Sequence, residues 1–144
     1  MNKALALAAF LLVSCTAEAP TPEIVVENAW ARAAAHGRSS TAVYLTIRNT
    51  GGGDRLVEVS SPAGEASLHS TSMAGGIMRM RSVEAVDVPA GSAVKLEPGG
   101  NHVMLSGLKS PLAAGSTIPL ELKFERSGDK KVEAAVRAAS AKGE

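Results

Sequence analysis

From residue 24 onward the chain alternates short runs of β-forming residues with turns rich in Gly or Pro. Within these runs apolar and polar positions alternate, so that Val43, Leu45 and Ile47 fall on one face of a strand. Strands separated by turns at intervals of roughly 8–12 residues are typical of an all-β sandwich or barrel. We predict strands at residues 24–30, 41–48, 55–60, 65–69, 77–83, 93–96, 102–105, 118–124 and 131–136.

The first fifteen residues have the pattern of a secretory signal. Lys3 precedes an unbroken apolar stretch over residues 4–13, which is too short for a permanent membrane span. Residues 12–15 (LVSC) resemble the bacterial lipobox, whose Cys is lipidated and becomes the first mature residue. The alternative is an ordinary signal peptide that happens to contain a Cys. We expect a lipoprotein signal peptide over residues 1–14 and a lipid anchor at Cys15, which would hold the domain at a membrane surface outside the cytoplasm.

The rest of the chain divides into three parts. Residues 15–23 comprise the lipidated Cys and a tether with two prolines, and residues 24–137 form one β-domain. Residues 138–144 form a tail without His or Met. Val, Leu, Ile and Ala are numerous enough to supply the core, so a metal site would serve function and not folding.

The composition argues against several classes of function. With 15 basic and 14 acidic residues, the chain has no electrostatic reason to bind nucleic acid, and its aromatic residues are too few for base stacking. The single Cys excludes an internal disulfide, and its lipidation leaves no thiolate for a blue-copper or zinc site. The sequence lacks a Gly-x-Ser-x-Gly motif, and His69-Ser70 is too weak a signal for a catalytic triad. We therefore expect no enzyme activity.

Sulfur and imidazole side chains are concentrated in one third of the mature chain. Because residues two apart share a strand face, His102 and Met104 point away from Val103 and Leu105, which form the natural core face. We expect them on the opposite face or at the sheet edge. The other members of this cluster are His69, Met73, Met78 and Met80.

The chemistry of this cluster favours a soft metal. Thioether and imidazole groups without thiolate or carboxylate favour Cu(I) over Zn²⁺, iron, Mg²⁺ or Ca²⁺. A thioether cannot be oxidised to a disulfide outside the cytoplasm, and it binds reversibly, as a carrier requires. A chance cluster of Met and His, with the Met residues filling gaps in the core, and a site for another metal remain alternatives.

Four of these residues stand in a known pattern. His69, Met80, His102 and Met104 form H-x10-M-x21-H-x-M, which resembles the motif of the periplasmic CuA chaperone (PCuAC) family. Further segments that resemble this family occur in the same order, at residues 29–32, 42–49, 78–81, 88–91, 98–100 and 107–109.

The resemblance implies both a fold and a function. The fold would be a cupredoxin-like or immunoglobulin-like Greek-key β-sandwich. The protein would be a periplasmic Cu(I) metallochaperone that delivers copper to the CuA centre of cytochrome c oxidase by ligand exchange, often beside a Sco-type thiol protein. His69, Met80, His102 and Met104 would be the Cu(I) ligands, with Met78 and Met73 as candidate auxiliary ligands.

Some expectations concern the surroundings of this site. Arg79 and Arg81 alternate with the Met residues and form either a solvated face or a docking surface for an acidic copper acceptor. We interpret His36 as an exposed loop residue and expect a monomer. The competing hypothesis for the whole protein is a lipid-anchored adhesion or envelope-assembly module in which the Met/His cluster is incidental.

Overall fold

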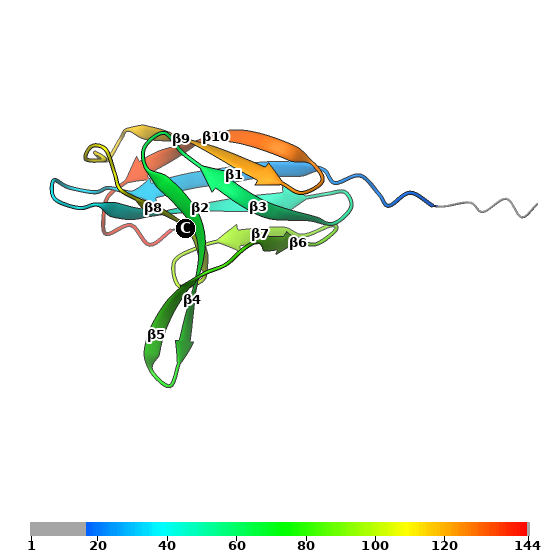
Figure 1. The fold of residues 1–144 in the computed structure, drawn as a ribbon, viewed down its shortest axis with the longest axis horizontal. Coiled ribbons are helices and arrows are strands. Elements are labelled where there is room, and N and C mark those ends of the chain that lie inside the picture. Colours follow the sequence, from blue (N-terminus) through cyan, green and yellow to red (C-terminus); the bar gives the residue numbers. More distant parts are fainter. Residues whose placement is uncertain (1–16, 144) are drawn as a thin grey trace, which may run out of the picture.

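The computed structural model describes residues 17–143, which form ten strands and no helix (Figure 1). The all-β prediction is confirmed. The strands are β1 (Ile24–Arg32), β2 (Ser40–Asn49), β3 (Asp54–Ser60), β4 (Glu65–Ala74), β5 (Ile77–Ser82), β6 (Val86–Val88), β7 (Ala93–Leu96), β8 (Asn101–Ser106), β9 (Thr117–Phe124) and β10 (Gly128–Arg137). The expected signal segment and Cys15 lie outside the described residues. Within residues 17–143 no helix could span a bilayer.

The strands are hydrogen-bonded in the order β5-β4-β8-β2-β1-β10-β9-β3-β6. The pairing of β1 with β10 is parallel, and the others are antiparallel. Strand β2 changes partner along its length, since Ser40–Val43 pair with β8 and Leu45–Arg48 pair with β7. Strand β8 consequently lies inside the sheet, between β2 and β4.

Alternating side chains from nine strands enclose one core. In β9, Ile118, Leu120, Leu122 and Phe124 are buried while the residues between them face outward. Full burial of each such side chain contributes about 1.5–3 kcal/mol. Strand β5 contributes nothing to this core, because all six of its residues are exposed.

Strands β4 and β5 form a hairpin that projects from the sandwich (Figure 1). Pairing of β4 with β8 ends at Ser70–Asn101, and the rest of β4 pairs with β5 alone. Gly75 and Gly76 form a two-residue turn with φ of 58° and 76°, a conformation that glycine adopts without strain. The predicted end of β4 at residue 69 was wrong by five residues.

Two buried polar side chains fix the loops at one end of the sandwich. Asn49 is 1% exposed, and its side-chain amide donates hydrogen bonds to the carbonyls of Gly52 and Val88. Its side-chain oxygen accepts a hydrogen bond from the backbone N–H of Gly51. Asp54 accepts hydrogen bonds from the backbone of Arg55, Arg126 and Ser127 and from the Ser127 hydroxyl. Burial raises the pKa of Asp54, but these hydrogen bonds outweigh burial and hold the pKa below its ordinary value.

Candidate metal centre

Two histidines from distant parts of the chain face each other across neighbouring strands. His69 in β4 is the direct partner of His102 in β8, and their ring centres are 5.9 Å apart at an angle of 34°. Two residues along, Ser67 is paired with Met104, so Met104 shares the face of the two imidazoles. The other face of β8 carries Val103 and Leu105, both fully buried. His102 thus lies on the face opposite the core, as expected, but not at a sheet edge.

Each imidazole leaves one buried nitrogen without a partner. His102 Nδ1 donates to the carbonyl of Gly100 at 3.1 Å, which fixes the proton on Nδ1 and leaves the Nε2 lone pair free. His69 Nε2 lies 3.1 Å from Ser67 Oγ and 3.5 Å from Ser82 Oγ, while its Nδ1 has no partner. Buried polar atoms are normally hydrogen-bonded, so two unpartnered nitrogens on facing rings fit a pair of metal-binding donors.

The surroundings of His102 keep its imidazole neutral. The residue is 3% exposed, and burial lowers its pKa below 6.5. The hydrogen bond to Gly100 opposes this shift, and the neighbouring His69 adds to it. A neutral imidazole is the form that binds a metal.

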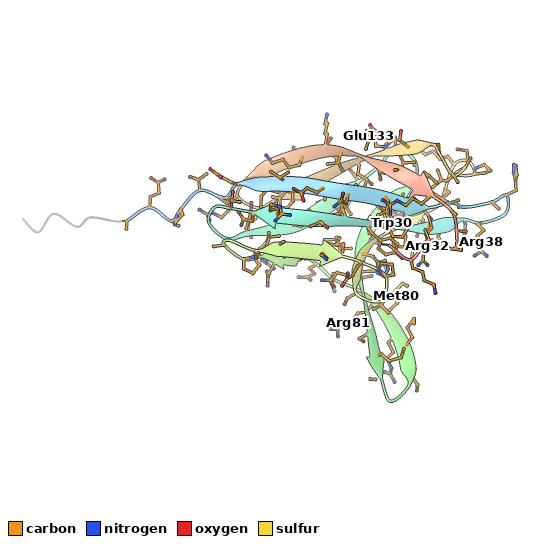
Figure 2. All side chains as sticks on the ribbon, turned by 180° about the vertical axis from the view of Figure 1, so that it is seen from behind. Trp30, Arg32, Arg38, Met80, Arg81 and Glu133 are labelled. Atoms are coloured by element: carbon orange, nitrogen blue, oxygen red, sulfur yellow. The ribbon has the colours of Figure 1, made fainter. Side chains whose placement is uncertain are left out.

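The thioethers lie at the margin of the histidine pair. Met104 is half-buried, whereas Met80 is 51% exposed on β5. Met80 pairs with Thr71, which is two residues along β4 from His69, so Met80 lies on the same face of the hairpin as His69. Figure 2 places Met80 near the base of the hairpin. Among the described residues no group of three His, Cys, Asp or Glu side chains could hold a metal, so a site here depends on sulfur as well.

An aromatic row continues from His102 across the sheet. The Tyr44 ring is 6.3 Å from His102, and Trp30 is 4.7 Å from Tyr44. A register shift in β1, where Asn28 has φ 52°, sets Trp30 opposite Tyr44. The Arg32 guanidinium lies 5.5 Å from the Tyr44 ring, and Figure 2 labels Trp30 and Arg32 on this part of the molecule. Burial raises the pKa of Tyr44 despite Arg32, so its phenol is neutral and does not act as an anionic ligand.

Sequence reasoning gave these aromatic residues no part in the site. Their signal was present, because Trp30 and Tyr44 belong to the segments that resemble the family. The proximity of Tyr44 to His102 and of Trp30 to Tyr44, however, depends on strand register, which a single sequence does not supply. The Gly100 carbonyl that orients His102 was missed for the same reason.

Other candidate residues lie away from the two histidines. Met73 and Met78 are each 65% exposed, at the far part of the hairpin. His36 is exposed in a loop, as expected. The ligand roles of His69, Met80, His102 and Met104 remain a prediction.

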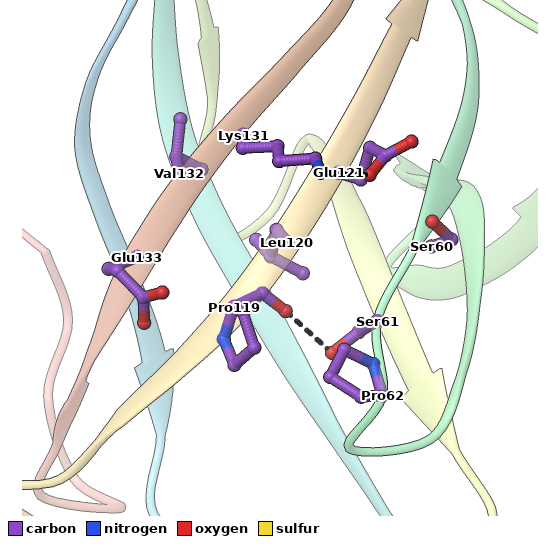
Figure 3. A pocket seen from close by; sticks show the side chains of 9 residues that line it. All are labelled: Ser60, Ser61, Pro62, Pro119, Leu120, Glu121, Lys131, Val132 and Glu133. Atoms are coloured by element: carbon purple, nitrogen blue, oxygen red, sulfur yellow. Dashed lines mark hydrogen bonds and ion pairs between the residues drawn. The ribbon is translucent and has the colours of Figure 1, made fainter.

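A groove of about 550 Å³ lies on a different part of the molecule (Figure 3). It is lined by β9, β10 and the end of β3, and the Ser61 hydroxyl crosses one end to donate to the Pro119 carbonyl at 2.8 Å. Its lining includes no His or Met and shares no residue with the histidine pair. The groove therefore offers nothing to a soft metal.

Comparison with known proteins gives consistent matches. The family model described as "Putative lipoprotein LpqE-like" matches residues 24–136. A protein of Leifsonia xyli subsp. xyli, "Putative lipoprotein Lxx21020", is 40% identical over 104 residues, covering 70% of this chain. The match spans 61% of that relative's length.

Several solved structures have the same fold. The "apo PmoF2 PCuAC domain" has a TM-score of 0.69 at 28% identity, covering 84% of this chain and 94% of that domain. The "Copper-bound PCuAC domain from PmoF2" has a TM-score of 0.68 at 28% identity, covering 80% and 92%. The Cu(I) form of DR1885 from Deinococcus radiodurans has a TM-score of 0.62 at 32% identity, covering 83% and 82%. The cupredoxin-like β-sandwich is therefore confirmed, and the chain belongs to the LpqE-like family and to the periplasmic CuA chaperone (PCuAC) family.

Proposed function

We propose that the protein is an extracytoplasmic Cu(I) chaperone and not an enzyme. The observation that supports this proposal most directly is the facing pair His69 and His102, each with a buried ring nitrogen that lacks a hydrogen-bond partner. The printed descriptions of the PmoF2 domain and DR1885, which include copper-bound forms, support copper as the cargo.

The donor set suits a monovalent ion that must be released. His69, His102, Met80 and Met104 would supply two imidazole nitrogens and two thioether sulfurs, all of them neutral. Soft neutral donors stabilise Cu(I) and do not satisfy the hard cations Mg²⁺ and Ca²⁺. Because Met80 is exposed while His102 is buried, an acceptor would displace the thioether first and the imidazoles afterwards.

The family and the N-terminal sequence support a proposal for the place of delivery. A lipid on Cys15 would anchor the domain to a membrane, with residues 16–23 as the tether, and the lipoprotein relatives support this. We infer that the compartment is the periplasm. The proposed acceptor is the CuA centre of cytochrome c oxidase or a Sco-type thiol protein that serves it, and the chaperone would act as a monomer.

An anaerobic Cu(I) titration against a chromophoric chelator tests the binding proposal. The wild-type protein should bind tightly, whereas His102→Ala and Met104→Ala should lose affinity by at least about tenfold. His36→Ala removes an imidazole from an exposed loop and should leave the affinity unchanged. A protein without measurable affinity for Cu(I) would instead favour the adhesion or envelope-assembly module.

A further inference from the structure

The register of the β4–β5 hairpin gathers a second set of sulfur atoms. Met73 is the direct partner of Met78, and this pair lies two residues nearer the turn than the Thr71–Met80 pair. Because every second cross-strand pair of residues lies on the same face, Met73, Met78 and Met80 lie on the face of the hairpin that carries His69. The other face carries the pairs Ser70–Arg81 and Ser72–Arg79.

Packing does not explain these methionines. Met73 and Met78 are 65% exposed and Met80 is 51% exposed, although Met is usually a residue that fills gaps in the core. Beyond Ser70, β4 pairs with no strand except β5, so no further strand of the sandwich covers these methionines. Adjacent exposed apolar side chains of this kind mark functional surfaces.

The spacing permits all three sulfur atoms to reach one ion. Directly opposed residues have Cβ atoms about 4.5–5.5 Å apart, and diagonal neighbours are about 7–8 Å apart. Met73 and Met78 are opposed, and Met80 is diagonal to Met73. A Met side chain has three rotatable bonds, so the three thioethers can converge above the hairpin face.

We propose that Met73, Met78 and Met80 form a second Cu(I) site, the hairpin thioether site, through which the ion enters and leaves the histidine pair. This inference rests on the proposed function. Met80 belongs to both sites, because it lies between Met78 on β5 and the His69 row on β4.

Transfer between the two sites requires only ligand exchange. The bonds from copper to Met73 and Met78 sulfur would break as bonds to the two imidazole nitrogens and to Met104 sulfur form, and Met80 sulfur would stay bound. Copper remains Cu(I), and no proton or electron moves. Since every ligand is neutral, the charge of the complex stays at +1 throughout. The imidazole site binds more tightly and is the resting position, and the hairpin presents the ion to a partner.

Two variants separate the sites. Met73→Leu/Met78→Leu keeps the apolar surface but removes both sulfur atoms, and it should retain the wild-type Cu(I) affinity within about threefold. Its rate of Cu(I) transfer to a competing chelator should fall at least about tenfold. Ile77→Leu is the matched control, because Ile77 is 57% exposed on the same hairpin but on the other face. It should transfer copper at the wild-type rate.

The reciprocal variant isolates the hairpin. His69→Ala/His102→Ala should bind one Cu(I) at least about tenfold more weakly than wild type, with only sulfur neighbours in X-ray absorption. The proposal would be overturned if this variant bound no Cu(I), or if Met73→Leu/Met78→Leu transferred copper at the wild-type rate. In either case the wild-type protein would still bind Cu(I) at the histidine pair. Failure of the proposed function would look different, because the wild-type protein itself would then bind no Cu(I).

A measurement on the wild-type protein covers the case in which the histidine variant does not fold. With carbon-13 in the methionine methyl groups, a second equivalent of Cu(I) should shift the resonances of Met73 and Met78. Unmoved resonances for both residues would refute the hairpin thioether site.

Discussion

Replacing His102 by Leu tests whether its imidazole is kept for binding or for folding. The side chain is 3% exposed, and it makes one hydrogen bond, from Nδ1 to Gly100 O, while Nε2 has none. Leu has a similar volume and no polar atom. The substitution therefore removes one satisfied and one unsatisfied nitrogen from the same place.

The balance can be worked out from these two atoms. Losing the hydrogen bond costs about 1 kcal/mol, and the Gly100 carbonyl is not stranded because Thr71 N also donates to it at 3.0 Å. Removing a buried nitrogen without a partner returns about 1–3 kcal/mol. The free energy of unfolding of apo His102→Leu should range from unchanged to about 2 kcal/mol higher, equivalent to roughly 8 °C in Tm at most.

Thermal and urea unfolding of the apo and copper-loaded proteins provide the assay. Free Cu(I) at about 100 times the wild-type Kd should stabilise the wild type by about 2.7 kcal/mol and His102→Leu by no more than about 1.4 kcal/mol, because the affinity of the variant is at least about tenfold lower. His36→Leu is the control, since His36 is exposed, and it should keep the copper-dependent gain. If apo His102→Leu loses more than about 1 kcal/mol, the imidazole is structural and the reasoning is refuted. Stabilisation by copper that is as large in His102→Leu as in the wild type would remove this residue from the ligand set.

Three further predictions concern protonation and charge. Copper retention should fall in acid, because protons compete with copper for the imidazoles. Burial lowers the pKa of His102, so the copper loss that results from protonation of His102 begins below pH 6.5. Copper retention under anaerobic conditions that is flat down to about pH 4 would contradict His ligation. Asp54→Asn should lower the free energy of unfolding by about 2 kcal/mol in urea, against little change for the exposed Asp129→Asn. Because the pKa of Asp54 is below its unfolded value of 3.8, that stabilisation is present above pH 3.8 and disappears as pH falls through the lower folded pKa; equal losses for the two variants would refute the assignment. Arg79→Glu/Arg81→Glu should slow copper transfer to an acidic acceptor at low salt by at least about fivefold, and a rate unchanged by both the charges and the ionic strength would exclude docking through this face.

Strands could be predicted where apolar and polar residues alternate because one face of the strand is buried, and not elsewhere. Strand β9 buries every second residue, so its pattern is plain in the sequence. Strand β6 was missed because Val86–Val88 has only three residues, too few to show a period. Residues 70–74 of β4 were missed for a different reason, since neither face of the hairpin is buried and no hydrophobic pattern records the pairing.

The sequence is sufficient to name candidate site residues but not to predict how they are arranged. The spacing of His69, Met80, His102 and Met104 identified the candidates, and alternation placed His102 opposite the core. Burial of His102 was not foreseen, because it depends on strand register, which also sets the Tyr44 ring 6.3 Å from the His102 ring. The unpartnered nitrogens were equally beyond the sequence, since the hydrogen bonds of the other two ring nitrogens involve Gly100 and two serines.

The two halves of the candidate centre differ in how firmly the fold holds them, and this difference gives a direction to copper exchange. His102 lies on β8, which is paired on both sides and buried, so its imidazole is oriented before any ion binds. Met80 lies on β5, an edge strand without a single buried residue. Of the four proposed ligands Met80 is the most exposed, so an incoming ligand would meet the bond to this thioether first. A buried imidazole on β8 and a half-buried one on β4, beside the exposed thioether of Met80, would thus combine retention of the ion with a route for its release.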